Sequence, residues 1–161
     1  MHTIGRDFIL GFPGTISSQV DAIKDSFPVM SSANIGFGIP VVLDSTKKGI
    51  ILFSATSAAA DLVGFTIRTM KPEQTYAGND PAYKQNDEAD VLLRGPMVVK
   101  VATGTPVRNG KVYLRKATGE IVCAAEGSGG ADTVQLTNVI FSHNGKDANS
   151  STEITILSRQ A

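Results

Sequence analysis

The chain has 161 residues, of which 42% are hydrophobic and 19% are charged, and its formal net charge is zero. This length predicts one domain with a substantial core, and the apolar content argues against intrinsic disorder. Proteins that bind nucleic acid usually carry a basic excess, so we expect no nucleic-acid partner. Because the chain holds a single cysteine, Cys123, an internal disulfide is excluded.

The sequence offers no targeting or membrane-spanning segment. No basic segment followed by an apolar run stands near Met1, and no window reaches the roughly 18 apolar residues that a membrane span needs. We therefore expect a soluble protein, cytosolic or associated with a particle, with no membrane partner.

Residues 1–35 are expected to form an N-terminal arm with a short irregular or helical segment, ahead of a β-sandwich domain in residues 36–161. Glycine and proline interrupt the first apolar residues of the arm, which follow neither a helical nor a strand period. Such residues suit either an arm that binds a partner or a segment that wraps its own domain. They are Phe8, Ile9, Leu10 and Phe12.

A helical spacing of apolar residues follows the arm and stops at Pro28, which would end a helix. This spacing predicts a short helix over residues 17–27. The spaced residues are Ile16, Val20, Ile23 and Phe27.

From residue 36 onward, short apolar runs alternate with turn residues, which is typical of a β-sandwich or β-barrel. A long polar loop is expected at residues 71–89, and a meander over residues 90–123 with tight turns at Asn109-Gly110 and Thr118-Gly119. The expected strands cover residues 39–43, 49–55, 62–70, 91–101, 112–114, 121–123, 133–143 and 151–159.

Residues 91–101 show the clearest strand pattern. Their odd positions carry no charge, whereas Arg94 and Lys100 occupy even positions. A period of two predicts that Val99 is buried and that Arg94 and Lys100 lie on the opposite face. Pro96 cannot donate a ladder hydrogen bond, so the strand must bulge or lie at an edge near it.

No motif points to a catalytic, cofactor or metal site. Residues 104–111, GTPVRNGK, resemble a phosphate-binding loop but have the wrong spacing, and Val112 stands where a metal-binding hydroxyl is needed. The carboxylates of residues 87–90 suit a solvated loop end better than a calcium site. His2 and His143 are the only histidines, which leaves no transition-metal set.

Six segments carry a resemblance to a known family: GFPGTISSQ (11–19), GFGIPVVLD (36–44), LVGFTIRT (62–69), DEADVLLRGPMVVKV (87–101), TPVRNGKVYLRKATGEI (105–121) and LTNVIFSHNGKDANSSTEITIL (136–157). In this order along the chain, they resemble the capsid cement, or head-decoration, proteins of tailed bacteriophages, of the jelly-roll type found on short-tailed phages. The resemblance implies an all-β, single-domain jelly-roll β-sandwich or barrel with an extended N-terminal arm.

The resemblance also implies a structural, non-enzymatic protein without cofactors. Made in the host cytoplasm, it would bind the outer surface of the virion capsid and bridge major capsid proteins to stabilise the shell. We expect a homo-oligomer, trimer or dimer, whose arm contacts the capsid through Phe8, Ile9, Leu10, Phe12, Pro13 and Ile16.

Two alternatives from other classes stay open. A carbohydrate-binding jelly-roll module displayed on a virion would use exposed aromatic and polar residues of the 71–89 loop. A small hydrolase would need a catalytic triad built around His143. The candidate sugar-binding residues are Tyr76, Tyr83, Asn79 and Asp80.

Overall fold

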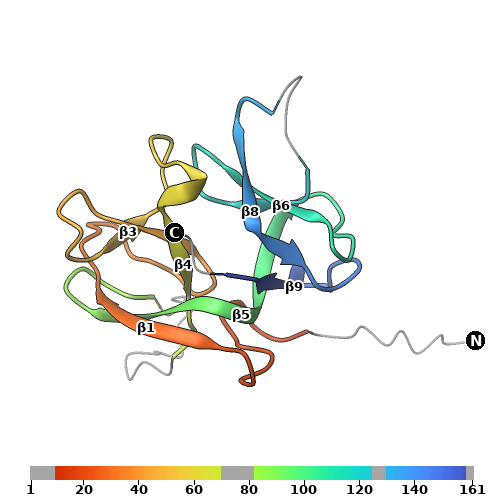
Figure 1. Ribbon diagram of the computed structural model, residues 1–161, viewed down its shortest axis with the longest axis horizontal. Coiled ribbons are helices and arrows are strands. Elements are labelled where there is room, and N and C mark those ends of the chain that lie inside the picture. Colours follow the sequence, from red (N-terminus) through yellow and green to blue (C-terminus); the bar gives the residue numbers. More distant parts are fainter. Residues whose placement is uncertain (1–9, 70–81, 125–129, 159–161) are drawn as a thin grey trace, which may run out of the picture.

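The computed structural model describes residues 10–69, 82–124 and 130–158. Within these ranges the regular structure is almost entirely β, which confirms the expected fold class (Figure 1). A 3-10 helix, η1 (Ala59–Asp61), precedes the fourth strand. The strands are β1 (Ile23–Pro28), β2 (Pro40–Leu43), β3 (Ile50–Leu52), β4 (Leu62–Thr66), β5 (Glu88–Thr103), β6 (Lys111–Arg115), β7 (Ile121–Val122), β8 (Thr133–Phe141) and β9 (Ser151–Ile156).

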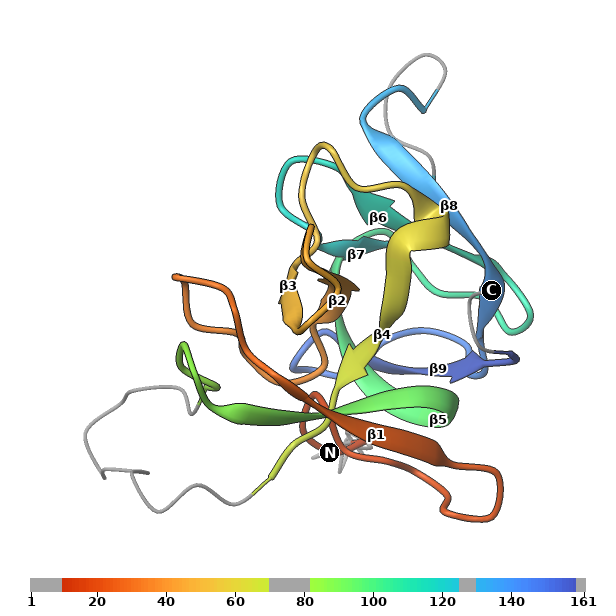
Figure 2. The ribbon, with the colours of Figure 1, turned by 60° about the vertical axis from the view of Figure 1, so that its left-hand side comes forward.

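The 16-residue strand β5 belongs to two sheets. Its N-terminal half pairs with β4 and β1 in an open sheet of order β3-β2-β4-β5-β1. Its C-terminal half pairs with β9 and β7, and the circuit β5-β7-β6-β8-β9 closes back on β5 as a small barrel. Figures 1 and 2 show β5 running from the lobe that holds β1–β4 to the lobe that holds β6, β8 and β9.

The expected meander over residues 90–123 is wrong. β7 lies between β5 and β6 and runs parallel to β5, with Val101 opposite Ile121. The expected hairpin at Asn109-Gly110 is also wrong, because Gly110 N–H donates to the Val107 carbonyl at 2.7 Å and closes a turn within a longer connection. The turn at Thr118-Gly119 is confirmed: Gly119 has a φ of 70° and its N–H donates to the Arg115 carbonyl at 2.8 Å.

The two sheets enclose two clusters of buried side chains. The first fills the barrel and extends under one face of the open sheet. Val99 is completely buried in it, as expected, and so is Leu114. The second lies on the other face of the open sheet. Its buried members are Val29, Ile35, Phe37, Val41, Ile50, Tyr83, Ala89, Val91 and Leu93.

The side of β5 on which odd-numbered side chains lie changes where the strand passes from one sheet to the other. Leu93 packs in the second cluster, but Met97 and Val99, also at odd positions, pack in the first. Gly95 lies between them with a φ of 120°, a conformation that disfavours other residues. Lys100 is exposed, as the alternation predicts.

The helix expected over residues 17–27 is wrong. Residues 23–28 form β1, which pairs antiparallel with β5, from Ile23 opposite Arg94 to Pro28 opposite Glu88. Val20 is 96% exposed, so the helical spacing marks no buried face. Strand pairing with β5 satisfies the backbone of a segment whose own residues favour a helix only weakly.

On the N-terminal side of the expected boundary at residue 35, Val29 and Ile35 are completely buried in the second cluster. The division into residues 1–35 and 36–161 stays a prediction. Of the expected 71–89 loop, residues 71–81 lie outside the described residues, and its last two residues open β5.

Candidate partner-binding site

The described part of the N-terminal arm is fixed to β5 by backbone hydrogen bonds. Gly14 N–H donates to the Val98 carbonyl at 2.8 Å, and Val98 N–H donates to the Thr15 carbonyl at 2.9 Å. Ser17 N–H donates to the Pro96 carbonyl at 3.2 Å. Residues 14–17, here called the arm root, therefore lie antiparallel beside residues 96–98 of β5, beyond the residues that pair with β4. Val98 is only 2% exposed.

Gly14 is the tightest point of the arm root. Its carbonyl accepts a hydrogen bond from Arg68 N–H at 2.8 Å, so it links β5 to the chain that follows β4. Its φ is 85°, and a Cβ here would lie 2.8 Å from the Phe37 Cβ and 2.9 Å from the amide nitrogens of Arg68 and Gly38. Only glycine fits without displacing backbone.

Arg68 also orients the aromatic residue that precedes the arm root. Its guanidinium carbon lies 4.7 Å from the centroid of the Phe12 ring and 5.4 Å from that of Phe37. Phe37 is buried, whereas Phe12 is 63% exposed. This cation–π arrangement holds the Phe12 ring against the domain while leaving most of it accessible to a partner.

The Phe37 ring packs against the buried ring of Tyr83. Their rings meet edge to face, with centroids 5.4 Å apart. The Tyr83 hydroxyl donates to the Ile67 carbonyl at 2.7 Å, and burial raises the pKa of this hydroxyl above its ordinary value. Arg68 therefore rests on a rigid aromatic base.

The six residues predicted to bind a partner have different environments. Leu10 is half-buried, and its N–H donates to Asp147 Oδ2 at 3.2 Å. Pro13 is half-buried, and Ile16 packs against the barrel core beside Met97. Phe8 and Ile9 lie outside the described residues. Among the four that are described, Phe12 presents the largest free apolar surface.

Sequence reasoning missed Arg68 and the function of Gly14. Arg68 follows a strand like many surface cations, and nothing in the sequence pairs it with Phe12. The glycines of the arm were visible only as interruptions of a pattern. The glycine that follows Phe12 and Pro13 in an aperiodic segment is the one signal that could have indicated close backbone contact.

The structure removes one support of the sugar-binding alternative. Tyr83 is completely buried in the second cluster and cannot stack on a ligand at the surface. Tyr76, Asn79 and Asp80 lie outside the described residues. His143, the residue on which the hydrolase alternative depends, is exposed in the loop between β8 and β9.

The acidic residues near the start of β5 make local hydrogen bonds. Asp87 Oδ2 accepts the Lys84 N–H at 2.9 Å, and Asp90 Oδ1 accepts the Ser26 hydroxyl at 2.5 Å. In the described part of the chain, no group of three or more acidic, histidine or cysteine side chains could hold a metal ion. The same residues contain no helix long and apolar enough to cross a membrane.

Comparison with known proteins agrees with the resemblance seen in the sequence. The family described as "Structural cement protein (E217 gp24/Pam3 gp6)" matches residues 2–157. A search of curated proteins by sequence gave no match.

Five chains of solved structures also match. One, from "The capsid of Myoviridae Phage XM1", has a TM-score of 0.70 at 16% sequence identity, and the alignment covers 96% of this chain and 98% of that chain. This likeness supports the jelly-roll-like fold. Because the family match spans nearly the whole chain, the protein belongs to the structural cement proteins of bacteriophages, whose place is the virion capsid.

Proposed function

We propose that this protein is a non-enzymatic cement protein that binds the outer surface of the expanded capsid. It bridges neighbouring copies of the major capsid protein, and this bridging stabilises the shell. Family membership supports a structural role on the capsid. The observation that carries the proposed contact is the arm root on β5, which presents the Phe12 ring at the surface.

The proposed capsid contact is the arm itself, through Phe8, Ile9, Leu10, Phe12, Pro13 and Ile16. Full burial of a phenylalanine side chain contributes roughly 1.5–3 kcal/mol, so one arm gives a weak contact once ordering costs are subtracted. The fixed arm root lowers the ordering cost, because residues 14–17 are already held on β5.

We further propose that the protein acts as a homo-oligomer, a dimer or trimer. In an oligomer the second and third arms bind intramolecularly, and avidity then exceeds the affinity of one arm by about 10²–10⁴. Several weak arms thus support a stable attachment that one arm cannot give.

The substitution Phe12→Ser tests this contact. We expect a folded protein whose occupancy on expanded capsids is clearly reduced, because the exposed ring is the apolar surface offered to the partner. Occupancy is measured by mixing the purified variant with expanded capsids lacking the protein and imaging the particles by electron cryomicroscopy.

Leu157→Ser is the matched control, since Leu157 is also exposed, at 49%, but lies after β9 and outside the arm. It should decorate like the unchanged protein. A shortened protein lacking residues 1–11 should decorate less than Phe12→Ser while keeping the arm root. Full occupancy by both Phe12→Ser and the shortened protein would move the capsid contact away from the arm.

A further inference from the structure

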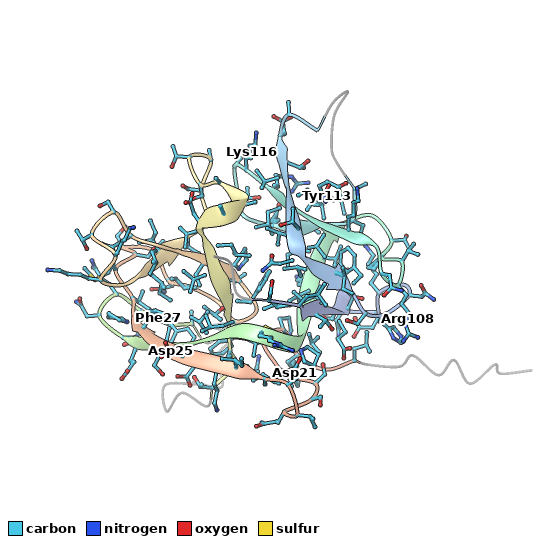
Figure 3. All side chains as sticks on the ribbon, in the orientation of Figure 1. Asp21, Asp25, Phe27, Arg108, Tyr113 and Lys116 are labelled. Carbon is cyan, nitrogen blue, oxygen red and sulfur yellow. The ribbon has the colours of Figure 1, made fainter. Side chains whose placement is uncertain are left out.

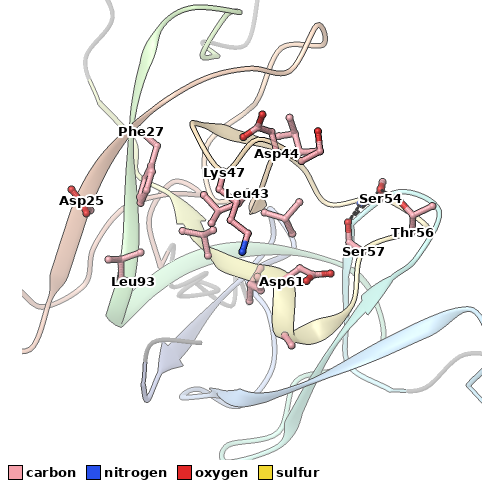
Figure 4. A pocket seen from close by; sticks show the side chains of 16 residues that line it. Asp25, Phe27, Leu43, Asp44, Lys47, Ser54, Thr56, Ser57, Asp61 and Leu93 are labelled. Carbon is pink, nitrogen blue, oxygen red and sulfur yellow. Dashed lines mark hydrogen bonds between the residues drawn. The ribbon is translucent and has the colours of Figure 1, made fainter. Parts of the chain in front are cut away.

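A groove on the open sheet combines an apolar floor with negative charge. It has a volume of about 740 Å³ and is bordered by β1, β5, the turn after β2, and η1 (Figure 4). Its charged side chains are Asp25, Asp44, Asp61 and Lys47, so three carboxylates and one ammonium group give a net charge of −2. Its larger apolar lining residues are Phe27, Val42, Leu43, Ile51, Leu62, Val63 and Leu93.

The negative charge of this acidic groove is held in place by the fold. Asp44 Oδ1 accepts N–H groups from Lys48 at 2.9 Å and Gly49 at 3.1 Å. The hydrogen bond from the Thr46 hydroxyl lowers the pKa of the Asp44 carboxyl further, so this group is ionised at neutral pH. Asp61 accepts the Ala58 N–H at 2.7 Å.

A turn at the other end of the molecule has the opposite character. Residues 104–110, here called the Val107 turn, expose the Val107 side chain at 63% and the Arg108 side chain beside it. Within the described residues Arg108 makes no ion pair. Lys146, also exposed, lies in the adjoining loop between β8 and β9.

Four backbone N–H groups hold the Val107 turn in one conformation. Gly110 N–H donates to the Val107 carbonyl and Asn109 N–H to the Phe141 carbonyl, both at 2.7 Å. Arg108 N–H donates to Asn144 Oδ1, and Gly145 N–H to the Pro106 carbonyl, both at 2.8 Å. The exposed valine therefore stands on a rigid support, which lowers the entropy lost when a partner binds it.

We propose that the Val107 turn of one copy docks into the acidic groove of a second copy of this chain. An apolar side chain flanked by Arg108 and Lys146 complements an apolar groove flanked by carboxylates. Self-association is part of the proposed function, and this inference names the two surfaces that make it.

The two surfaces cannot meet within one copy. Arg108 lies at one end of the long axis, whereas Asp25 and Phe27 lie toward the other (Figure 3). Contacts between different surfaces of identical chains are heterologous and close into a ring when the rotation between copies allows it. A three-fold rotation between successive copies would close such contacts into a trimer.

Two double variants test the contact. The turn variant carries Val107→Ser and Arg108→Ser, and the groove variant carries Asp25→Lys and Leu43→Ser. All four side chains are exposed, and the hydrogen bonds of the Val107 turn come from its backbone, so both variants should fold. We expect each to weaken self-association at least about tenfold, the scale of hot-spot residues.

Mixing gives the decisive measurement. The turn variant keeps an intact groove and the groove variant keeps an intact turn, so one intact contact forms per pair. By light scattering, the unchanged protein should be an oligomer, each variant alone should be a monomer, and their equimolar mixture should form a heterodimer that grows no further. An interface that pairs like surfaces, turn with turn or groove with groove, would not give this pattern.

Leu157→Ser and Asp132→Lys are the controls for apolar surface and for charge, since both residues are exposed and lie outside the two surfaces. They should keep the mass of the unchanged protein. Circular dichroism checks folding, and if the groove variant fails it, Asp25→Lys alone replaces it.

A monomeric unchanged protein, variants that keep its mass, or a mixture that stays monomeric would each overturn the proposed contact. Capsid decoration is scored separately. Decoration that persists while the mixing pattern fails removes only this inference. A correct mixing pattern without any decoration would instead remove the proposed function.

Discussion

Leu114→Ala is expected to lower the free energy of unfolding by about 2–5 kcal/mol, the range for large-to-small changes in a core. Leu114 is completely buried on β6, between β7 and β8, and belongs to the cluster that fills the barrel. A closed barrel of short strands has little freedom to collapse around the space left by the lost atoms. Urea unfolding followed by circular dichroism measures the change.

Lys100→Ala provides the comparison. Lys100 lies on β5 opposite Ser151 of β9, but its side chain is exposed. Surface substitutions of this kind usually change the free energy of unfolding by no more than about 0.5 kcal/mol. A loss at Lys100 equal to that at Leu114 would show that the two faces of β5 are assigned incorrectly.

Gly14→Ala is expected to destabilise the protein by more than the roughly 1–3 kcal/mol of a strained left-handed residue. The extra loss comes from contact, because the new Cβ would lie 2.9 Å from the Arg68 and Gly38 amide nitrogens. The arm root must then separate from β5 or from Arg68. We expect a lower urea midpoint and weaker capsid decoration in the same variant.

Gly145→Ala separates backbone strain from steric contact. Gly145 has a φ of 75°, close to the 85° of Gly14, but a Cβ there meets nothing within 4 Å. The difference between the two variants therefore reports the close approach alone. Equal destabilisation by both would mean that the arm root moves aside without loss.

The strand pattern of β5 was predictable, but its division between two sheets was not. The uncharged odd positions correctly predicted that Val99 is buried, and Val91, at another odd position, is buried as well. They face different clusters because the chain turns over at Gly95, and a glycine next to a proline indicates a bulge without indicating where each half then packs.

Tertiary pairing decided the segments that sequence reasoning assigned wrongly. Residues 17–27 have a helical spacing of apolar residues, yet β1 forms because the edge of β5 is available over six residues. The parallel partner β7 has only two residues, too few for any period to show. Its place beside β5 depends on the closure of the barrel, a long-range feature.

The partner-binding role of the arm stays a prediction. The aperiodic apolar residues drew attention to the arm, and the structure leaves the Phe12 ring exposed. Residues 14–17 behave differently, because they are hydrogen-bonded to their own domain. A list of apolar residues cannot separate these two behaviours, since backbone hydrogen bonds do not depend on side-chain type.

The sharing of β5 between the sheet and the barrel has a mechanical consequence. Leu93 in the wall of the acidic groove and Val98 beneath the arm root lie on this one strand. In the proposed assembly, tension between a neighbour bound at the groove and a shell bound by the arm would therefore pass along the continuous backbone of β5. Because ladder hydrogen bonds run perpendicular to antiparallel strands, such a pull shears the bonds to β1 and β9 together instead of opening them one at a time.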